Sequence, residues 1–158
     1  MGSDVFRPIC AVENERPADL ITRGARRLIA SLGYSSVCEL SLPNGRRADI
    51  VGISHAGEII IIEVKSCLAD YLADNKWREY QPYCDRFYFA LAPDGPAQRI
   101  PDDSGLIVAD GYAAEVIRDA PAMTINGARR RAVLLAFARH AADRLHLLQD
   151  RNKGEMRW

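Results

Sequence analysis

Four consecutive isoleucines, Ile59–Ile62, run directly into the charged sequence Glu63–Lys65. Successive side chains of a β-strand point to opposite faces, so four adjacent isoleucines leave no face for solvent. Such a strand has to be central in a sheet that is covered on both sides. This requirement favours a layered α/β architecture, and it places two charged side chains at the end of a buried strand.

Length and composition set the remaining bounds. The chain has 158 residues, of which 48% are hydrophobic, so one ordinary globular domain is expected. We divide it into a leader at 1–16, a domain at 17–150 and a tail at 151–158. No C-x-x-C pair occurs among the four cysteines, so a zinc ribbon is not favoured. With no signal peptide and no apolar run near ~20 residues, a cytoplasmic protein that does not enter a membrane is expected.

Hydrophobic periodicity predicts the element order α-β-β-β-α-β, followed by a β-hairpin and a helix. The strands at 37–42, 47–53 and 58–66 form an antiparallel meander, because short turns join them. The other predicted elements are helices at 17–33, at 68–84 and from a cap at Thr124 or Asn126 to about 149, and strands at 86–91, 105–109 and 113–117.

The predicted chemistry lies at the end of the isoleucine strand. Glu63 and Lys65 are two residues apart and share a face. Asp49 lies on the preceding strand, 63 − 49 = 14 residues upstream, so a hairpin can bring it beside Glu63. Two adjacent carboxylates repel each other unless a cation lies between them. A hydrated Mg²⁺ suits such oxygen ligands and could activate water for phosphodiester hydrolysis, with the lysine stabilising the developing charge.

A simpler interpretation stays open. An E-x-K sequence occurs often by chance, and Glu63 and Lys65 could form an ordinary pair at an exposed strand end, with Asp49 in a turn. The apolar strand that leads into Glu63, and the helix predicted after it, favour the metal site. No G-x-G-x-x-G or P-loop motif is present, so dinucleotide and P-loop sites lose their main support. His140 and His146 are six apart on a predicted helix and do not form a metal pair.

Local motifs resemble known families. The sequences R-R-A-D-I at 46–50 and I-E-V-K-S at 62–66 resemble the PD-(D/E)XK nuclease superfamily. The stretch D-N-K-W-R-E-Y at 74–80 and then C-D-R-F-Y-F-A at 84–90 resembles the MmcB family of bacterial DNA-repair proteins, and the resemblance extends over 17–150. It implies a restriction-endonuclease-like core with a mixed central sheet, a role in DNA repair, and use of Mg²⁺ or Mn²⁺.

The resemblance also implies residue roles. Asp49 and Glu63 match the metal carboxylates of the superfamily, and Lys65 matches its catalytic lysine. Val64 occupies the middle position, whose backbone carbonyl can complete the coordination.

One ligand departs from the superfamily pattern. Many members carry a further Glu on the first helix, where this chain offers Thr22 or Asp19. Glu39 on the first strand is either a substitute ligand or a surface residue.

Contacts to nucleic acid have to be local, because 21 basic and 21 acidic residues give zero net charge. Lys76 and Tyr80 are four apart on a predicted helix, where some relatives place a Gln and a Tyr against nucleic acid. The alternative is that Tyr80 packs in the core and Lys76 lies at its rim. The arginines that could contact phosphate, including the candidate Arg47, form three groups: Arg23, Arg26 and Arg27; Arg46 and Arg47; and Arg129–Arg131.

Three functional hypotheses follow. The first is a metal-dependent nuclease, a hydrolase that acts on DNA in repair. The second is a non-catalytic adaptor of nuclease fold that binds DNA or repair proteins. The third is a small-molecule or structural protein in which Glu63 and Lys65 simply pair. A second copy of the chain is a further candidate partner, because the last helix carries an apolar stripe that is either core or a dimer interface: Leu134, Ala138, Ala141, Leu145 and Leu148.

Overall fold

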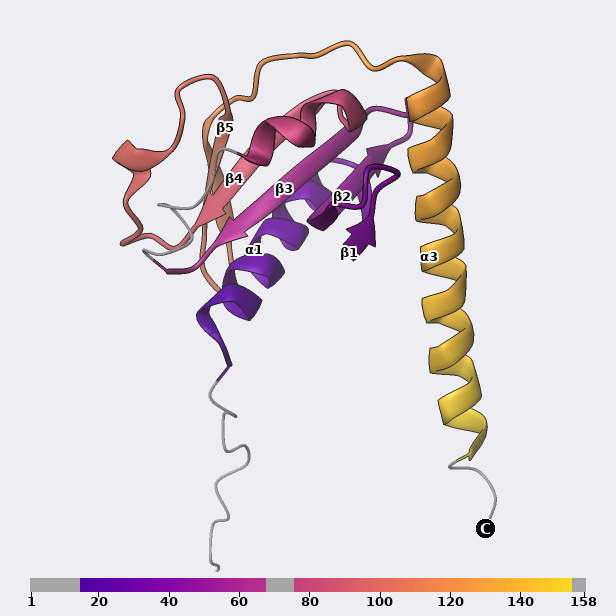
Figure 1. The fold of residues 1–158 in the computed structure, drawn as a ribbon. Coiled ribbons are helices and arrows are strands. Elements are labelled where there is room, and N and C mark those ends of the chain that lie inside the picture. Colours follow the sequence, from indigo (N-terminus) through magenta and orange to yellow (C-terminus); the bar gives the residue numbers. More distant parts are fainter. Residues whose placement is uncertain (1–14, 68–75, 155–158) are drawn as a thin grey trace, which may run out of the picture.

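A computed structural model describes residues 15–67 and 76–154, with side chains to residue 150 (Figure 1). Six strands form one sheet in the order β1-β2-β3-β4-β5-β6. The strands are β1 (Tyr34–Ser41), β2 (Arg47–Ser54), β3 (Ile59–Lys65), β4 (Arg86–Leu91), β5 (Gly105–Ala109) and β6 (Ala114–Arg118). The described helices are α1 (Pro17–Ser31) and α3 (Gly127–Gly154), and the described 3-10 turns are η1 (Lys76–Glu79), η2 (Gln81–Tyr83) and η3 (Ala97–Arg99).

The sheet is mixed. β1, β2 and β3 are antiparallel neighbours, which confirms the predicted meander. β4 pairs with β3 in parallel, and β5 pairs with β4 in parallel. β6 returns antiparallel to β5, so the predicted C-terminal hairpin is also present. The chain is therefore an α/β protein in which all the predicted strands occur.

The isoleucine strand is buried on both faces, as its sequence requires. Ile59 and Ile61 contribute to a core cluster with η1, η2 and the first half of α3. Ile60 and Ile62 contribute to a second cluster, which lies under α1. The odd-numbered residues of β3 therefore face the aromatic side of the sheet, and the even-numbered residues face α1. This alternation decides the face on which Glu63 lies.

The helix boundaries follow local signals. α1 begins with Pro17 in its first turn, where a missing N–H costs nothing. It ends before Gly33, whose φ of 88° suits a residue without a side chain. Asn126 caps α3, because its Oδ1 accepts a hydrogen bond of 2.8 Å from the N–H of Ala128. α3 runs to Gly154 and is longer than the sequence predicted.

The helix predicted over 68–84 is wrong in its described part. Residues 68–75 lie outside the described residues, and the rest forms the two 3-10 turns. Pro82 lacks an N–H and its ring opposes a continuous helix, which explains the break. Trp77, Tyr80 and Cys84 are nevertheless buried in one cluster, as expected for residues that share a face.

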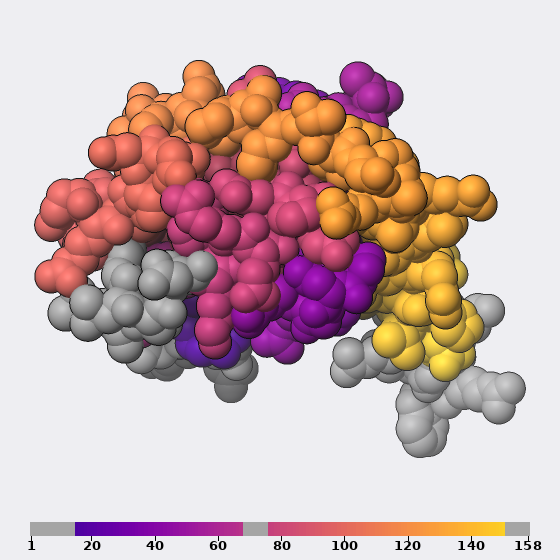
Figure 2. Space-filling view, turned by 45° about the horizontal axis from the view of Figure 1, so that its top comes forward, coloured from indigo at the N-terminus to yellow at the C-terminus, as the bar shows by residue number. Residues whose placement is uncertain are grey.

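α3 packs on the sheet over only part of its length. Val133 is fully buried, and Leu134 and Ala141 pack against the core. Farther along, Leu145 and Leu148 are 55% and 60% exposed, and this end of the helix stands away from the sheet (Figures 1 and 2). Of the predicted stripe, Leu134 and Ala141 thus pack against the core, whereas Ala138, Leu145 and Leu148 are exposed. None of the described helices is long and apolar enough to cross a membrane.

Candidate functional site

Asp49 and Glu63 meet on neighbouring strands. The pairing of β2 with β3 extends from Ile53 opposite Ile59 to Ile50 opposite Ile62. One further step along this register sets Asp49 opposite Glu63, and their side chains are hydrogen-bonded. The two carboxylates therefore lie on the same side of the sheet, which is the arrangement that a shared cation requires.

A local distortion of β1 accompanies this arrangement. Glu39 has a φ of 57°, in the left-handed region, where a residue other than glycine is strained. The ladder between β1 and β2 passes from Cys38 opposite Ile50 to Leu40 opposite Ala48 and omits the step at Glu39. Asp49, which lies at the omitted step, turns toward β3 and accepts a 2.8 Å hydrogen bond at Oδ2 from the N–H of Val64. The Asp49 side chain thus links the two strands where their backbone pairing ends.

Burial controls the charge of the pair. Glu63 is only 8% exposed. Burial, followed by the hydrogen bond and the repulsion from Asp49, raises the pKa of Glu63 to about 8, although Tyr80 and the charge of Lys65 act in the opposite direction. Glu63 therefore holds a proton at neutral pH, and the pair carries about one negative charge in place of two.

Tyr80 closes the core side of the site. It is 7% exposed and stacks on Phe87 with 5.8 Å between ring centroids. Its hydroxyl donates a 3.1 Å hydrogen bond to the carbonyl oxygen of Arg47 and also contacts Glu63. Burial and the neighbouring Glu63 raise the pKa of the Tyr80 hydroxyl. The structure thus places this predicted nucleic-acid contact in the core, against a carboxylate, and not on the surface.

The predicted cationic residues are buried to different extents. Lys65 follows Glu63 on the same face of β3, is half-buried, and has its Nζ 5.8 Å from the centre of the Phe89 ring. Arg47 is exposed at the start of β2, and Lys76 is exposed at the start of η1. Lys65 is therefore the predicted cation that shares a strand and a face with the carboxylates.

The carboxylate end of the sheet opens into a groove of about 430 Å³ between α1 and β1. Asp49 and Val64 line it together with Asp19 and Glu39. Asp19 is paired with Arg16 at 2.9 Å, and Glu39 has its Oε2 3.8 Å from Nη2 of Arg144. In residues 15–67 and 76–154, no group of three or more His, Cys, Asp or Glu side chains could hold a metal ion. Glu39 is therefore near Asp49 but is not gathered with it into a three-residue ligand set.

The donor set nevertheless fits a hydrated divalent ion. Mg²⁺ is often bound through one or two carboxylates while it keeps several waters. Asp49 and Glu63 supply two adjacent carboxylates, and their proton is held only because burial and mutual repulsion oppose two charges. A divalent cation relieves the same repulsion, so proton and metal compete for this site.

Some contacts had no signal in the sequence. Arg144 reaches Glu39 across 144 − 39 = 105 residues. His140, which was expected to be structural or exposed, has its Nε2 2.9 Å from the carbonyl oxygen of Cys38. The contact of Tyr80 with Glu63 was also missed, because the sequence left open whether Tyr80 packs in the core or contacts nucleic acid and gave it no partner. Long-range pairs of this kind depend on packing, which periodicity does not report.

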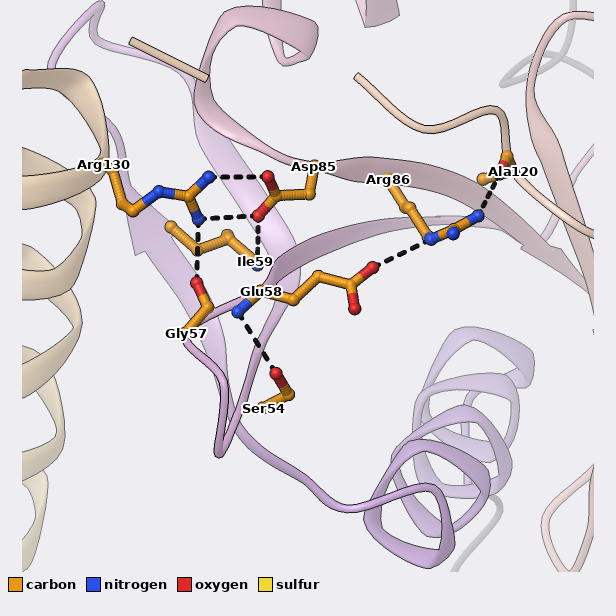
Figure 3. A network of polar contacts seen from close by, with 8 residues as sticks. All are labelled: Ser54, Gly57, Glu58, Ile59, Asp85, Arg86, Ala120 and Arg130. Carbon is orange, nitrogen blue, oxygen red and sulfur yellow. Dashed lines mark hydrogen bonds and ion pairs between the residues drawn. The ribbon is translucent and has the colours of Figure 1, made fainter. Parts of the chain in front are cut away.

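The opposite end of β3 carries a different polar network (Figure 3). Arg130 makes two hydrogen bonds to the Asp85 carboxylate, at 2.8 and 2.7 Å. Asp85 also accepts a 2.7 Å hydrogen bond from the N–H of Ile59. Beside it, Arg86 pairs with Glu58 at 2.8 Å. Here each carboxylate has an arginine, so this end of the strand is a structural anchor.

Comparisons with known proteins give one family and one similar structure. A family model described as DNA repair protein MmcB-like matches residues 7–152. A solved structure described as the SPO1766 protein of unknown function from Silicibacter pomeroyi is 40% identical in sequence, with a TM-score of 0.84, over 88% of this chain and 95% of that chain. No curated protein matches the chain.

Proposed function

The chain belongs to the MmcB-like family of DNA repair proteins, and on that premise we propose that it is a metal-dependent nuclease with a PD-(D/E)XK, restriction-endonuclease-like core. One observation carries the proposal. Asp49 and Glu63 are in hydrogen-bond contact on adjacent strands, and Glu63 is buried. A fold gains nothing from placing two mutually repelling carboxylates side by side, so their contact favours a ligand that needs both.

Each residue of the site would have its own role in binding the metal or the phosphodiester. Asp49 and Glu63 would hold Mg²⁺ or Mn²⁺, which supplies an activated water and neutralises charge on a phosphodiester. Tyr80 holds the Glu63 carboxyl in position, because its own hydroxyl is anchored on the carbonyl of Arg47. The Lys65 ammonium group, on the same face, would stabilise negative charge on the phosphate oxygens as the bond to the leaving oxygen breaks.

Metal binding and cleavage test this proposal together. We expect Mn²⁺ to bind the wild type in calorimetry, and binding to be lost in Asp49→Asn and Glu63→Gln. We expect a panel of labelled DNA substrates to be cut in Mg²⁺ or Mn²⁺ by the wild type and not by these variants or by Lys65→Ala. Glu115→Gln, at an exposed carboxylate on edge strand β6, is the matched control and should behave as wild type. A wild type that binds no Mn²⁺ would contradict the proposal.

One observation favours the second candidate, a non-catalytic DNA-binding adaptor. The carboxyl pair is already satisfied by a shared proton, by the N–H of Val64 and by Tyr80, so the fold does not depend on a metal. This candidate predicts DNA binding that survives Asp49→Ala and no cleavage with any divalent ion. The calorimetric titration separates the two, because only the nuclease requires a metal at this pair.

A further inference from the structure

The groove that Asp49 lines continues along α1. A second open hollow, of about 650 Å³, lies between α1 and the start of β1. The two hollows share Asp19 and Thr22 in their walls, so they adjoin along the seam between α1 and β1. One end of this α1–β1 groove holds Asp49, and the other end is lined by arginines.

The charges at the arginine end are unequally compensated. Arg16 pairs with Asp19, and Arg23 pairs with Glu15. Arg26 is exposed, and its hydrogen bonds go to the hydroxyl and carbonyl oxygens of Ser36, at 3.0 and 3.2 Å. Arg27 is exposed and donates a 3.2 Å hydrogen bond to the carbonyl oxygen of Tyr112. In the described part of the chain, these two guanidinium groups have only neutral acceptors, so two positive charges remain uncompensated.

The rest of the wall suits a phosphate backbone. Thr22, Tyr34, Ser35 and Ser36 line the same hollow and carry hydroxyl groups. Hydroxyl and guanidinium donors contact phosphate and sugar oxygens without reading a base sequence. The groove thus combines fixed positive charge with neutral donors, a combination that favours a polyanion over an apolar ligand.

In each of the other two arginine groups, one arginine is paired with a carboxylate. Arg46 is bound to the Glu79 carboxylate by two hydrogen bonds, at 2.6 and 2.8 Å. Arg130 is held by Asp85. The guanidinium of Arg129 lies 5.9 Å from the centre of the Tyr83 ring. Arg26 and Arg27 differ in that they are consecutive, pair with no acidic side chain of the described residues, and line one hollow together.

We propose that the α1–β1 groove binds the phosphodiester backbone of one DNA strand, with Arg26 and Arg27 on phosphates farther along the strand from the one at Asp49, the carboxylate of the pair that lines this groove. This inference rests on the proposed function and adds the path of the substrate. α1 rises about 1.5 Å per residue, so Arg26 lies roughly 6 Å beyond Thr22 along the helix. Phosphates of one strand recur about every 3.4 Å along a duplex, so about two nucleotides separate the arginines from the shared wall.

The test is the salt dependence of DNA binding. Fluorescence anisotropy of labelled single-stranded and duplex DNA, in EDTA from about 50 to 200 mM salt, compares the wild type with Arg26→Ala/Arg27→Ala. We expect the double variant to bind roughly tenfold more weakly, with a salt slope lower by about 1.5 to 2, because each phosphate contact contributes about 0.7 to 0.9. Arg26→Lys/Arg27→Lys should restore most of the slope, because the charge is kept.

A matched control separates this groove from a general effect of charge. Arg99→Ala/Arg131→Ala removes two exposed arginines from η3 and α3, away from α1. A salt slope that falls equally in both double variants, or in neither, would contradict DNA binding in the α1–β1 groove. So would tighter binding of an RNA oligonucleotide of the same sequence. If wild type binds DNA while the α1 variant is unchanged, the nuclease proposal stands without this groove. A wild type that binds no DNA at low salt would contradict both the nuclease proposal and the groove proposal.

Discussion

The two ends of β3 handle buried charge in opposite ways. At the start of the strand, Asp85 is neutralised by Arg130, and Glu58 is neutralised by Arg86. At the end of the strand, Asp49 faces Glu63, and Lys65 is on the same face. An arrangement that serves only stability would pair every carboxylate with a cation. The start of β3 is therefore built for the fold, whereas its end keeps two adjacent carboxyl groups whose repulsion a cation would neutralise.

Removing the ion pair between Arg130 and Asp85, at the start of β3, should have the largest effect on stability. Arg130→Ala removes both hydrogen bonds to Asp85 and the 2.8 Å hydrogen bond to the carbonyl oxygen of Gly57. It leaves a partly buried carboxylate without its cation, so we expect a loss of about 3 kcal/mol in the free energy of unfolding. Urea denaturation measures this loss. Arg131→Ala, at the next and exposed position, is the control and should stay within about 0.5 kcal/mol of wild type.

Removing one carboxyl group of the Asp49–Glu63 pair, at the end of β3, should stabilise the metal-free protein. Because the pKa of Glu63 is raised to about 8, the folded state binds a proton that the unfolded state releases above about 4.5. Stability contributed by this group is therefore present at low pH and is lost as pH rises to about 8. Glu63→Gln should be more stable than wild type by at least about 2 kcal/mol at pH 8, and the difference should vanish near pH 4. Urea titrations across this range in EDTA measure it.

The stability that Asp85 contributes, at the start of β3, should depend on pH in the opposite direction. Burial acts to raise the pKa of Asp85, but the hydrogen bonds from Arg130 and from the N–H of Ile59 outweigh it and lower the pKa. Its contribution is present above the unfolded value and is lost as pH falls. An advantage of Glu63→Gln that grows on acidification would contradict the assignment of opposite signs to the two ends.

The hydroxyl of Tyr80 should matter less. Tyr80→Phe keeps the ring against Phe87 and removes the hydrogen bonds to the Arg47 carbonyl and to Glu63. We expect a loss of about 1 kcal/mol in stability and a further rise in the pKa of Glu63, because this hydrogen bond favours the charged carboxylate. Carbon-detected NMR titration of the glutamate side chains measures the shift. Tyr112→Phe, on an 81% exposed ring, is the control and should change neither quantity.

The smallest expected effect concerns the backbone of β1. Glu39 is left-handed, a conformation that glycine adopts without a steric penalty. Glu39→Gly should therefore stabilise the protein by about 0.5 to 1 kcal/mol in urea denaturation, even though it removes a weak contact with Arg144. A loss of stability would show that the Glu39 side chain contributes more than its backbone strain costs.

Much of the fold followed from local patterns. The isoleucine run predicted a central covered strand, and the hairpin length brought Asp49 to Glu63, because strand register depends on nearby residues. The sequence did not reveal the left-handed Glu39, since αL geometry in a residue other than glycine has no local signature. Nor did it reveal Arg130 on Asp85, 45 residues away. The helix predicted over 68–84 is wrong over 76–84, because the apolar spacing there is helical but Pro82 opposes a continuous helix.

The antiparallel meander of β1, β2 and β3 has a consequence for how the chain acquires its structure. Asp49 and Glu63 both lie within it, and closing short loops costs less entropy than joining distant segments. The parallel pairings with β4 and β5, and the docking of α3, join segments farther apart and should come later. Pulsed hydrogen exchange during refolding should therefore protect the amides of β2 and β3 before those of β5. The acidic pair would then be assembled before the last helix closes over the sheet.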